Sequence, residues 1–364
     1  MNNLVLLAEF GRFGGTRTYF IQLVKLYIKK DIKVTVLLRK DQLDRDILVL
    51  LKENDVEIHI RPNFKVIGQT FPGYIFLYFL EFFYWKIRFV TSKLTVVLSG
   101  VGYFEYLASL IIFNRSLFVV HSYPVGKIRY ISYLSKYLIN KNKYILTVSN
   151  YSKEKIVENF SIRDSSLVQV INNTCDYGGE RDNKISLNKN IVTFGHLEKY
   201  KNPEYWLKVA EEVCKIDKDV SFAWFGEGSW EEIIKLKIIK GGLGKRIKLF
   251  KFVNNPREVL CDSYLYFQPS LVESFGLSVL EAMSLGIPSV VSNEGGLPEL
   301  VKDNVNGLVF DNFDVSNTAN TIMKIVNDEK FRNRLSSNCM EIYKNKYSPN
   351  IWEEKMFKLH QTIC

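Results

Sequence analysis

Along the whole chain, short apolar runs of the length of a β-strand alternate with longer segments in which apolar residues recur at the spacing of an α-helix. Residues 4–8, 34–38 and 94–98 are such runs in the first half, and residues 191–194 and 220–225 are such runs in the second. Each run is followed by a segment rich in good helix formers. This alternation is typical of α/β proteins, in which helices cover both faces of parallel sheets.

A polar stretch with a glycine pair, residues 177–189, interrupts this pattern near the middle. The length of 364 residues and the 47% hydrophobic content are enough for two cores. We therefore predict a first Rossmann-like domain over residues 1–178, a second over residues 179–346, and a final helix within residues 347–364.

The sequence favours a cytoplasmic protein. Five cysteines are scattered without the spacing of a metal or redox site, which indicates a reducing compartment. The first residues lack a basic region and read as a strand, not as a signal peptide. No apolar run reaches the length of a membrane span.

The net charge of +10 lies entirely in the first half of the chain. Residues 1–178 contain 24 Lys and Arg against 14 Asp and Glu, whereas residues 179–364 contain 25 of each kind. A basic half can meet nucleic acid, an anionic membrane or an anionic substrate, or it can serve solubility alone. Since no known nucleic-acid-binding motif accompanies the charge, we expect no nucleic-acid partner.

Residues 269–288 are the most informative stretch. They read as a loop, a helix from Leu277 to about Gly286, and a following strand. The amino end of that helix offers free N–H groups and partial positive charge, which suit a phosphate. Glu281 lies among apolar neighbours, where a carboxylate is costly without a partner. That partner is either a group inside the protein or a ligand with two adjacent hydroxyls.

The spacing Glu273-x7-Glu281, followed by Gly286-Ile287-Pro288 and then by residues 294–299 (Glu-Gly-Gly-Leu-Pro-Glu), resembles the retaining family-4 glycosyltransferases of the GT-B type. The resemblance implies two Rossmann-like domains that face each other across a cleft, with the last helix returning to the first domain. It implies that Glu281 binds the ribose of a nucleotide-sugar and that Glu273 lies beside the transferred sugar. The backbone between them would contact sugar and diphosphate at Ser274, Phe275, Gly276 and Leu277.

The same resemblance assigns further residues. His121, at the end of a strand, corresponds to the family's histidine beside the donor sugar, so His121 and Glu273 are the expected catalytic pair. The glycine loop with Gly14 and Gly15 would line the cleft, and the backbone near Val253 would read the nucleobase. Lys201 matches the lysine of the diphosphate clamp, but His196 stands where the family has arginine. A histidine lacks the permanent charge and the two-pronged geometry of arginine, so Arg12 or Arg17 is a possible substitute.

The implied function is transfer of a sugar, with retention, from a UDP- or GDP-linked donor to a saccharide acceptor in surface-polysaccharide synthesis, such as that of lipopolysaccharide. No cofactor or metal is expected. Two acidic pairs, Asp44 with Asp46 and Asp217 with Asp219, are interpreted as exposed helix-end residues. Alternatives are an epimerase of nucleotide-sugars on the same fold, and an inactive subunit that binds nucleotide-sugars or acts as a membrane scaffold.

Residues 71–89 contain ten aromatic residues and are punctuated by Lys86 and Arg88. Such composition suits a membrane interface, but a run that is apolar on all sides also suits a fully buried helix. On the first reading, residues 1–178 bind an anionic membrane, the acceptor is lipid-linked, and the protein lies peripherally at the inner face of the plasma membrane.

Overall fold

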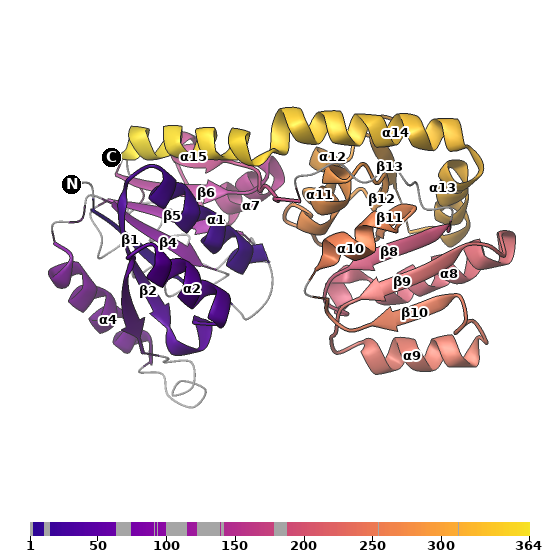
Figure 1. Cartoon of the computed structure of the whole chain (residues 1–364), viewed down its shortest axis with the longest axis horizontal. Coiled ribbons are helices and arrows are strands. Elements are labelled where there is room, and N and C mark those ends of the chain that lie inside the picture. Colours follow the sequence, from indigo (N-terminus) through magenta and orange to yellow (C-terminus); the bar gives the residue numbers. More distant parts are fainter. Residues whose placement is uncertain are drawn as a thin grey trace. The chain divides into compact units, whose positions relative to one another are not determined.

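The computed structural model describes residues 3–10, 15–62, 74–90, 92, 94–99, 115–121, 139, 142–177, 188–253, 255–311 and 313–364. The chain forms two compact units (Figure 1). The first comprises Met1–Asn172 with Glu353–Cys364, and the second comprises Asn173–Trp352. Each unit is an α/β layer structure around a parallel sheet, as the alternating pattern predicts.

The first unit contains a seven-stranded sheet in the order β3-β2-β1-β4-β5-β6-β7. Its strands are β1 (Asn3–Ala8), β2 (Lys33–Arg39), β3 (Glu57–Arg61), β4 (Leu94–Ser99), β5 (Ser116–Val120), β6 (Lys143–Thr147) and β7 (Val168–Val170). All paired strands are parallel, so their carboxyl ends share one edge of the sheet. The central strands are largely apolar and buried because helices cover both faces of the sheet.

The described helices of this unit are α1 (Gly15–Lys29), α2 (Arg45–Glu53), α4 (Tyr74–Arg88), α7 (Asn150–Phe160) and most of α15 (Pro349–Ile363). Helices α2 and α7 begin at conventional caps, since Asp44 accepts a hydrogen bond from the Ile47 amide and Ser149 accepts one from Ser152. Among the described residues, no helix combines the length and the apolar character needed to cross a bilayer.

Helix α15 packs against α1 of the first unit although it is the last element of the chain. The Tyr19 hydroxyl lies 3.4 Å from the sulfur of Met356, and Lys29 forms an ion pair of 2.6 Å with Glu353. Lys30 lies over the ring of Phe357. These contacts confirm that the last helix returns to the first unit.

The second unit contains a six-stranded parallel sheet in the order β10-β9-β8-β11-β12-β13. Its strands are β8 (Asn190–Phe194), β9 (Ser221–Phe225), β10 (Ile247–Phe250), β11 (Leu265–Gln268), β12 (Ser289–Ser292) and β13 (Gly307–Phe310). The helices are α8 (Pro203–Ile216), α9 (Glu231–Lys240), α10 (Pro256–Cys261), α11 (Leu277–Ser284), α12 (Leu297–Leu300), α13 (Val315–Asn327) and α14 (Glu329–Ile342). The core on one face of the sheet is centred on Trp206 and Trp224, whose rings meet edge to face.

The boundary between the units lies after Asn172, six residues before the predicted position. The residues that follow are tied to the second unit: Thr174 donates to the carbonyl of Tyr347, and the carbonyl of Cys175 accepts from the Tyr343 hydroxyl. Side chains that pair with a partner about 170 residues away give no local signal of a boundary. The returning part of the chain is likewise shorter than predicted, since only Glu353–Cys364 cluster with the first unit.

Helix α4 corrects the interpretation of the aromatic run as a fully buried helix. Phe82 and Trp85 are buried, but four other large apolar side chains in the described part of α4 are at least half exposed. Glu81, the only acidic residue of the helix, is buried and forms an ion pair of 2.6 Å with Arg61 at the end of β3. Arg61 also pairs with Glu9, so charged groups at the ends of β1 and β3 anchor the helix.

The two acidic pairs are also less exposed than expected. Asp44 caps α2 and pairs with Arg17 at 2.6 Å. Asp217 pairs with Lys189 at 2.8 Å, and this interaction lowers the pKa of Asp217. The prediction holds for Asp46 and Asp219, which are exposed.

Candidate active site

The loop between β11 and α11 presents the predicted donor-binding residues. Its start is fixed by buried polar contacts: the Gln268 amide donates to the Ser270 hydroxyl, and the Ser292 hydroxyl donates to the Ser270 carbonyl. Gly276 ends the loop with φ of 98°, a conformation that L side chains rarely adopt, and α11 begins at the next residue. A side chain at Gly276 would also approach Leu297 to 2.8 Å.

A second glycine segment lies against this loop and fixes its path. The amide of Gly296 donates to the carbonyl of Glu273 at 2.9 Å. Gly295 has φ of 62°, and a Cβ atom at Gly295 or Gly296 would collide with the backbone of Glu273 or Ser274. The Gly-Gly pair is therefore needed so that the two backbones can approach closely.

Lys201 and Glu273 form an ion pair, although 72 residues separate them in the sequence. Only 12% of the Lys201 side chain and 16% of the Glu273 side chain are exposed. The backbone holds the two segments together, because the carbonyl of Tyr200 accepts from the amide of Leu271 at 2.8 Å. The Lys201 side chain passes over Gly195, where a Cβ atom would lie 3.4 Å from its Cε. The structure thus brings two predicted ligand residues together beside the amino end of α11.

His196, the residue in place of the family's arginine, is exposed on the same strand-to-helix connection. Of the two possible substitutes, Arg17 forms ion pairs with Asp44 and Asp46 within the first unit. Arg12 lies outside the described residues. Of the two predicted clamp residues, Lys201 carries a permanent positive charge and His196 does not.

Glu281 lies on the α11 helix after the loop. Burial raises the pKa of Glu281 to about 7, and a hydrogen bond from Tyr177 partly offsets the rise. The side chain thus has a partner inside the protein, as the first of the two sequence interpretations expected. A carboxylate accepts several hydrogen bonds, and the Tyr177 hydroxyl supplies one of them. Glu281 can therefore still accept hydrogen bonds from a ligand.

Sequence reasoning missed Tyr177 and a row of stacked rings. Phe194, Phe225 and Phe250 are the last residues of β8, β9 and β10, and neighbouring rings in this row stack at 5.0 Å and 4.8 Å. The signal was available, because the same residue type ends three consecutive strands. The row stiffens the strand ends from which the site loops emerge.

Val253, the residue whose backbone is predicted to read the nucleobase, follows β10 and is half-buried.

His121 directly follows β5 in the first unit. Within the described part of the chain, its buried Nε2 atom has no hydrogen-bond partner, and its ring meets that of Tyr19 edge to face at 4.4 Å. Burial lowers the pKa of His121 to about 4, so the ring is neutral at physiological pH. A neutral ring with an open nitrogen suits a hydrogen bond to a sugar hydroxyl. Gly15, the first residue of α1, also belongs to this unit, and Gly14 lies outside the described residues.

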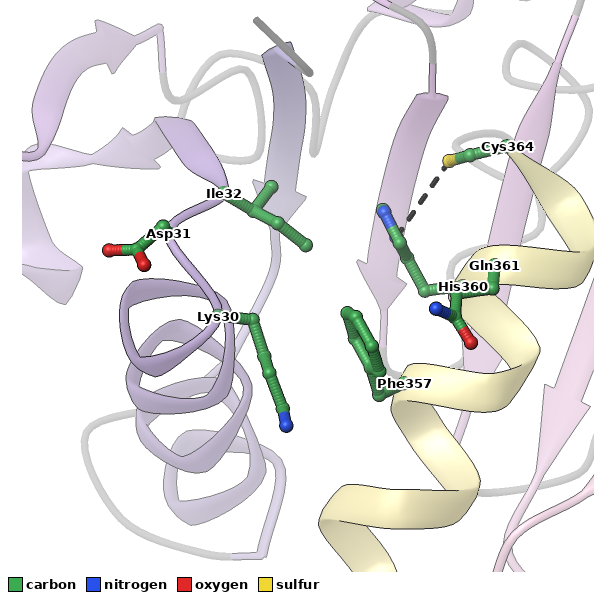
Figure 2. Close-up of a pocket in the computed structure, with 7 residues that line it drawn as sticks. All are labelled: Lys30, Asp31, Ile32, Phe357, His360, Gln361 and Cys364. Carbon is green, nitrogen blue, oxygen red and sulfur yellow. Dashed lines mark hydrogen bonds between the residues drawn. The ribbon is translucent and has the colours of Figure 1, made fainter.

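A separate pocket of about 390 Å³ lies between the end of α1 and α15 (Figure 2). Lys30, Ile32 and Phe357 point into it, Asp31 points away, and His360 turns toward Cys364, whose sulfur lies 3.8 Å from Nδ1. None of the residues that line this pocket is a predicted ligand or catalytic residue. The pocket is therefore part of the interface at which α15 packs against the end of α1.

Two parallel-sheet units, with helix α15 packed on the first, make up the GT-B fold. Residues 180–341, which lie within the second unit, match the family model of glycosyl transferases group 1. The solved structure of Anabaena Alr3699/HepE in complex with UDP and glucose has the same fold, with a TM-score of 0.78 and 18% identity over 98% of this chain and 99% of that one.

Two curated relatives are similar in sequence over part of the chain. The Escherichia coli UDP-Gal:alpha-D-GlcNAc-diphosphoundecaprenol alpha-1,3-galactosyltransferase is 28% identical over 54% of this chain and 54% of its own length. The Staphylococcus aureus poly(ribitol-phosphate) alpha-N-acetylglucosaminyltransferase is 30% identical over 45% of this chain and 34% of its own length. The matches thus span about half of the first relative and a third of the second.

Proposed function

We propose that the protein is a retaining glycosyltransferase that moves a sugar from a nucleotide-sugar to a saccharide acceptor of a cell-surface polymer. The observation that carries this proposal is the Lys201–Glu273 pair beside the amino end of α11, with Glu281 on the same helix. A cation and helix amides suit the diphosphate of the donor, and a carboxylate that can accept two hydroxyls suits the ribose.

The proposed chemistry depends on charge at the leaving group. As the bond from the anomeric carbon to the diphosphate breaks, negative charge grows on the phosphate oxygen. Lys201 and the amides at the start of α11 would stabilise that charge without reorganisation. We propose that the acceptor attacks from the same face of the sugar and that the leaving phosphate takes the acceptor's proton. Lys201 then supplies positive charge beside the leaving diphosphate, and His121 and Glu273 contact the transferred sugar.

The names of the relatives support a lipid-linked or polymeric acceptor. One acts on a saccharide attached to diphosphoundecaprenol and another on poly(ribitol-phosphate). A third, from Bacillus subtilis, is a poly(glycerol-phosphate) alpha-glucosyltransferase. We propose a lipid-linked saccharide as acceptor and a UDP- or GDP-sugar as donor.

The experiment begins with thermal shift of the purified protein against UDP, GDP and their common sugar conjugates. The conjugate that stabilises the protein is then incubated with and without a diphosphate-linked saccharide, and the product is analysed by NMR. An α-linked product from an α-linked donor supports a retaining transferase. Stabilisation by none of the nucleotides, or an inverted linkage, contradicts the proposal.

The exposed His196 favours a second candidate, an inactive subunit that only binds a nucleotide-sugar. Comparison of His196→Arg with Lys201→Ala distinguishes the two functions. In a transferase, Lys201→Ala lowers kcat about a hundredfold, as expected for loss of a buried group that stabilises the transition state, and His196→Arg keeps or raises kcat. A wild-type protein that binds the donor but neither hydrolyses nor transfers it, with no gain in His196→Arg, would be the binding subunit.

A further inference from the structure

Helix α4 presents two apolar faces, of which one is buried and the other is open to solvent. The buried face contains Phe82 and Trp85. The other face carries four large apolar side chains at helical spacing i, i+3, i+4 and i+7, each between 50% and 62% exposed: Leu80, Phe83, Tyr84 and Ile87. We call these four residues the outer stripe. In a helix that served only the core, these positions would be polar.

The orientation of the outer stripe is fixed by the anchor on the opposite side of the helix. Glu81 pairs with the fully buried guanidinium of Arg61 and accepts a hydrogen bond of 3.1 Å from the Trp85 indole. Arg61 in turn pairs with Glu9 at 2.9 Å. Rotation of the helix to bury the outer stripe would break this network and leave buried charges without partners, which is strongly unfavourable. Figure 1 shows α4 along the outside of the first unit.

The charges around the outer stripe indicate what it meets. Lys86 and Arg88 lie in the last turn of α4, and the helix exposes no acidic residue, because its single one is Glu81. On the neighbouring strand, the carboxylate of Glu57 is paired with His59, whose ring contacts Trp85 and Phe89. Aromatic and aliphatic side chains flanked by cations suit the headgroup region of an anionic bilayer.

A second copy of the chain fits this surface less well. Two such faces would bring Lys86 and Arg88 of both copies into one interface, and α4 exposes no acidic residue to pair with them. A stable protein interface also takes about 800 Å² from each partner, more than four side chains along two turns of one helix can supply.

We propose that the outer stripe of α4 inserts into the headgroup region of an anionic membrane and holds the first unit on its surface. Lys86 and Arg88 contact the lipid phosphates. Attachment is peripheral and salt-sensitive, since the charge term is screened at high ionic strength. This surface is separate from the proposed transfer reaction, which uses other residues, and it places the first unit where a lipid-linked acceptor is found.

The test is co-sedimentation of the full chain with vesicles of phosphatidylcholine alone or with about one-third phosphatidylglycerol, in low and in about 0.5 M salt. Wild type binds the anionic vesicles at low salt, and the double variant Phe83→Gln/Ile87→Gln binds them at least tenfold more weakly. The matched control is Leu236→Gln/Ile239→Gln on α9, which removes two similarly exposed side chains from a helix that begins with Glu231 and Glu232. The control binds within about twofold of wild type.

Three results would overturn the proposal. They are wild-type protein that ignores anionic vesicles at low salt, an α4 variant that binds as wild type does, and a dimer in light scattering that the α4 variant converts to monomer. Melting temperature and far-UV circular dichroism, which report both units, show that each variant is folded. Transfer to a water-soluble acceptor is measured in parallel. If sugar transfer persists while wild-type protein fails to bind vesicles, the proposed membrane-binding role of α4 is wrong, and the proposed transferase function is unaffected.

Discussion

Glu281 is the residue whose ionisation should control donor binding. Burial raises its pKa to about 7. A neutral carboxyl group has less acceptor capacity than a carboxylate, so donor affinity should rise as the pH increases from 6 to 8. Full ionisation strengthens the hydrogen bonds to the ribose, and the gain should be about tenfold for a charged acceptor. Isothermal titration with a nucleotide-sugar measures it, because the diphosphate of the conjugate does not titrate in this range.

The Glu281→Gln variant is the control for this prediction. Its amide has no ionisation, so its donor affinity should be lower than that of wild type at pH 8 and nearly constant with pH. A variant that retains the wild-type pH dependence would assign the titration to another group.

His121 should remain neutral throughout the physiological range. Burial lowers its pKa to about 4, and no step in activity between pH 5.5 and 8 should arise from this ring. His121→Ala should lower kcat at least tenfold and leave nucleotide affinity unchanged, since it removes a contact to the sugar only. NMR titration of the histidine ring carbons, assigned with this variant, measures the pKa. A value near 6.5 would show that the ring is solvated.

Among the elements, the loop from β11 to α11 depends on glycines of the segment that follows β12. Gly295 has φ of 62° and its Cα lies against the Glu273 backbone, so Gly295→Ala adds both strain and a collision. We expect it to displace Glu273, to weaken donor binding at least tenfold and to destabilise the fold by about 2 kcal/mol.

Gly242→Ala is the matched control for the loop. Gly242 has a similar φ of 67°, but no atom lies within 4 Å of the position of a new Cβ. This variant should lose about 1 kcal/mol of stability and keep its donor affinity. Equal loss of donor binding in both alanine variants would show that the collision with Glu273 does not matter.

The glycines near this loop allowed the sequence to predict where the loop ends and where α11 begins and ends. Gly276 and Gly286 mark both ends of α11, and both have positive φ. The pairing of Lys201 with Glu273 could not be predicted from spacing, because it depends on two strands that lie side by side in the sheet. The resemblance placed both residues at the diphosphate and sugar, and the structure adds their contact with each other.

Two elements of the first unit show where pattern reading fails. Strand β3 was missed because charged residues interrupt its apolar ones, as happens at a sheet edge where one side meets solvent. The exposed face of α4 was hidden for the opposite reason. Both of its faces are apolar, so the sequence alone does not show which face is buried. The Glu81–Arg61 ion pair fixes the orientation of the helix.

At the scale of the whole molecule, the first unit depends on a helix from the other end of the chain. Met356 of α15 is 1% exposed and contacts Tyr19. Met356→Ala should destabilise the first unit by about 2–4 kcal/mol through lost burial and a cavity. Lys355→Ala, at an exposed neighbouring position, should change stability by less than about 0.5 kcal/mol.

Urea unfolding followed by two signals measures this effect. Loss of donor binding reports the second unit, and far-UV circular dichroism reports both units. In Met356→Ala, part of the dichroism should be lost at lower urea than in wild type, and the donor-binding transition should stay in place. A common shift of both transitions would mean that the units unfold together.

The return of α15 also sets an order of events during synthesis. Residues 173–352 form a contiguous unit that can close as soon as they have emerged from the ribosome. The first unit, although it begins earlier in the chain, lacks Glu353–Cys364 until residues 173–352 have been made. The usual rule that the amino-terminal domain folds first is therefore reversed for the final step. Until residues 353–364 have been made, the side of α1 that receives α15 stays open, and a chain stalled before them would expose it to chaperones and proteases.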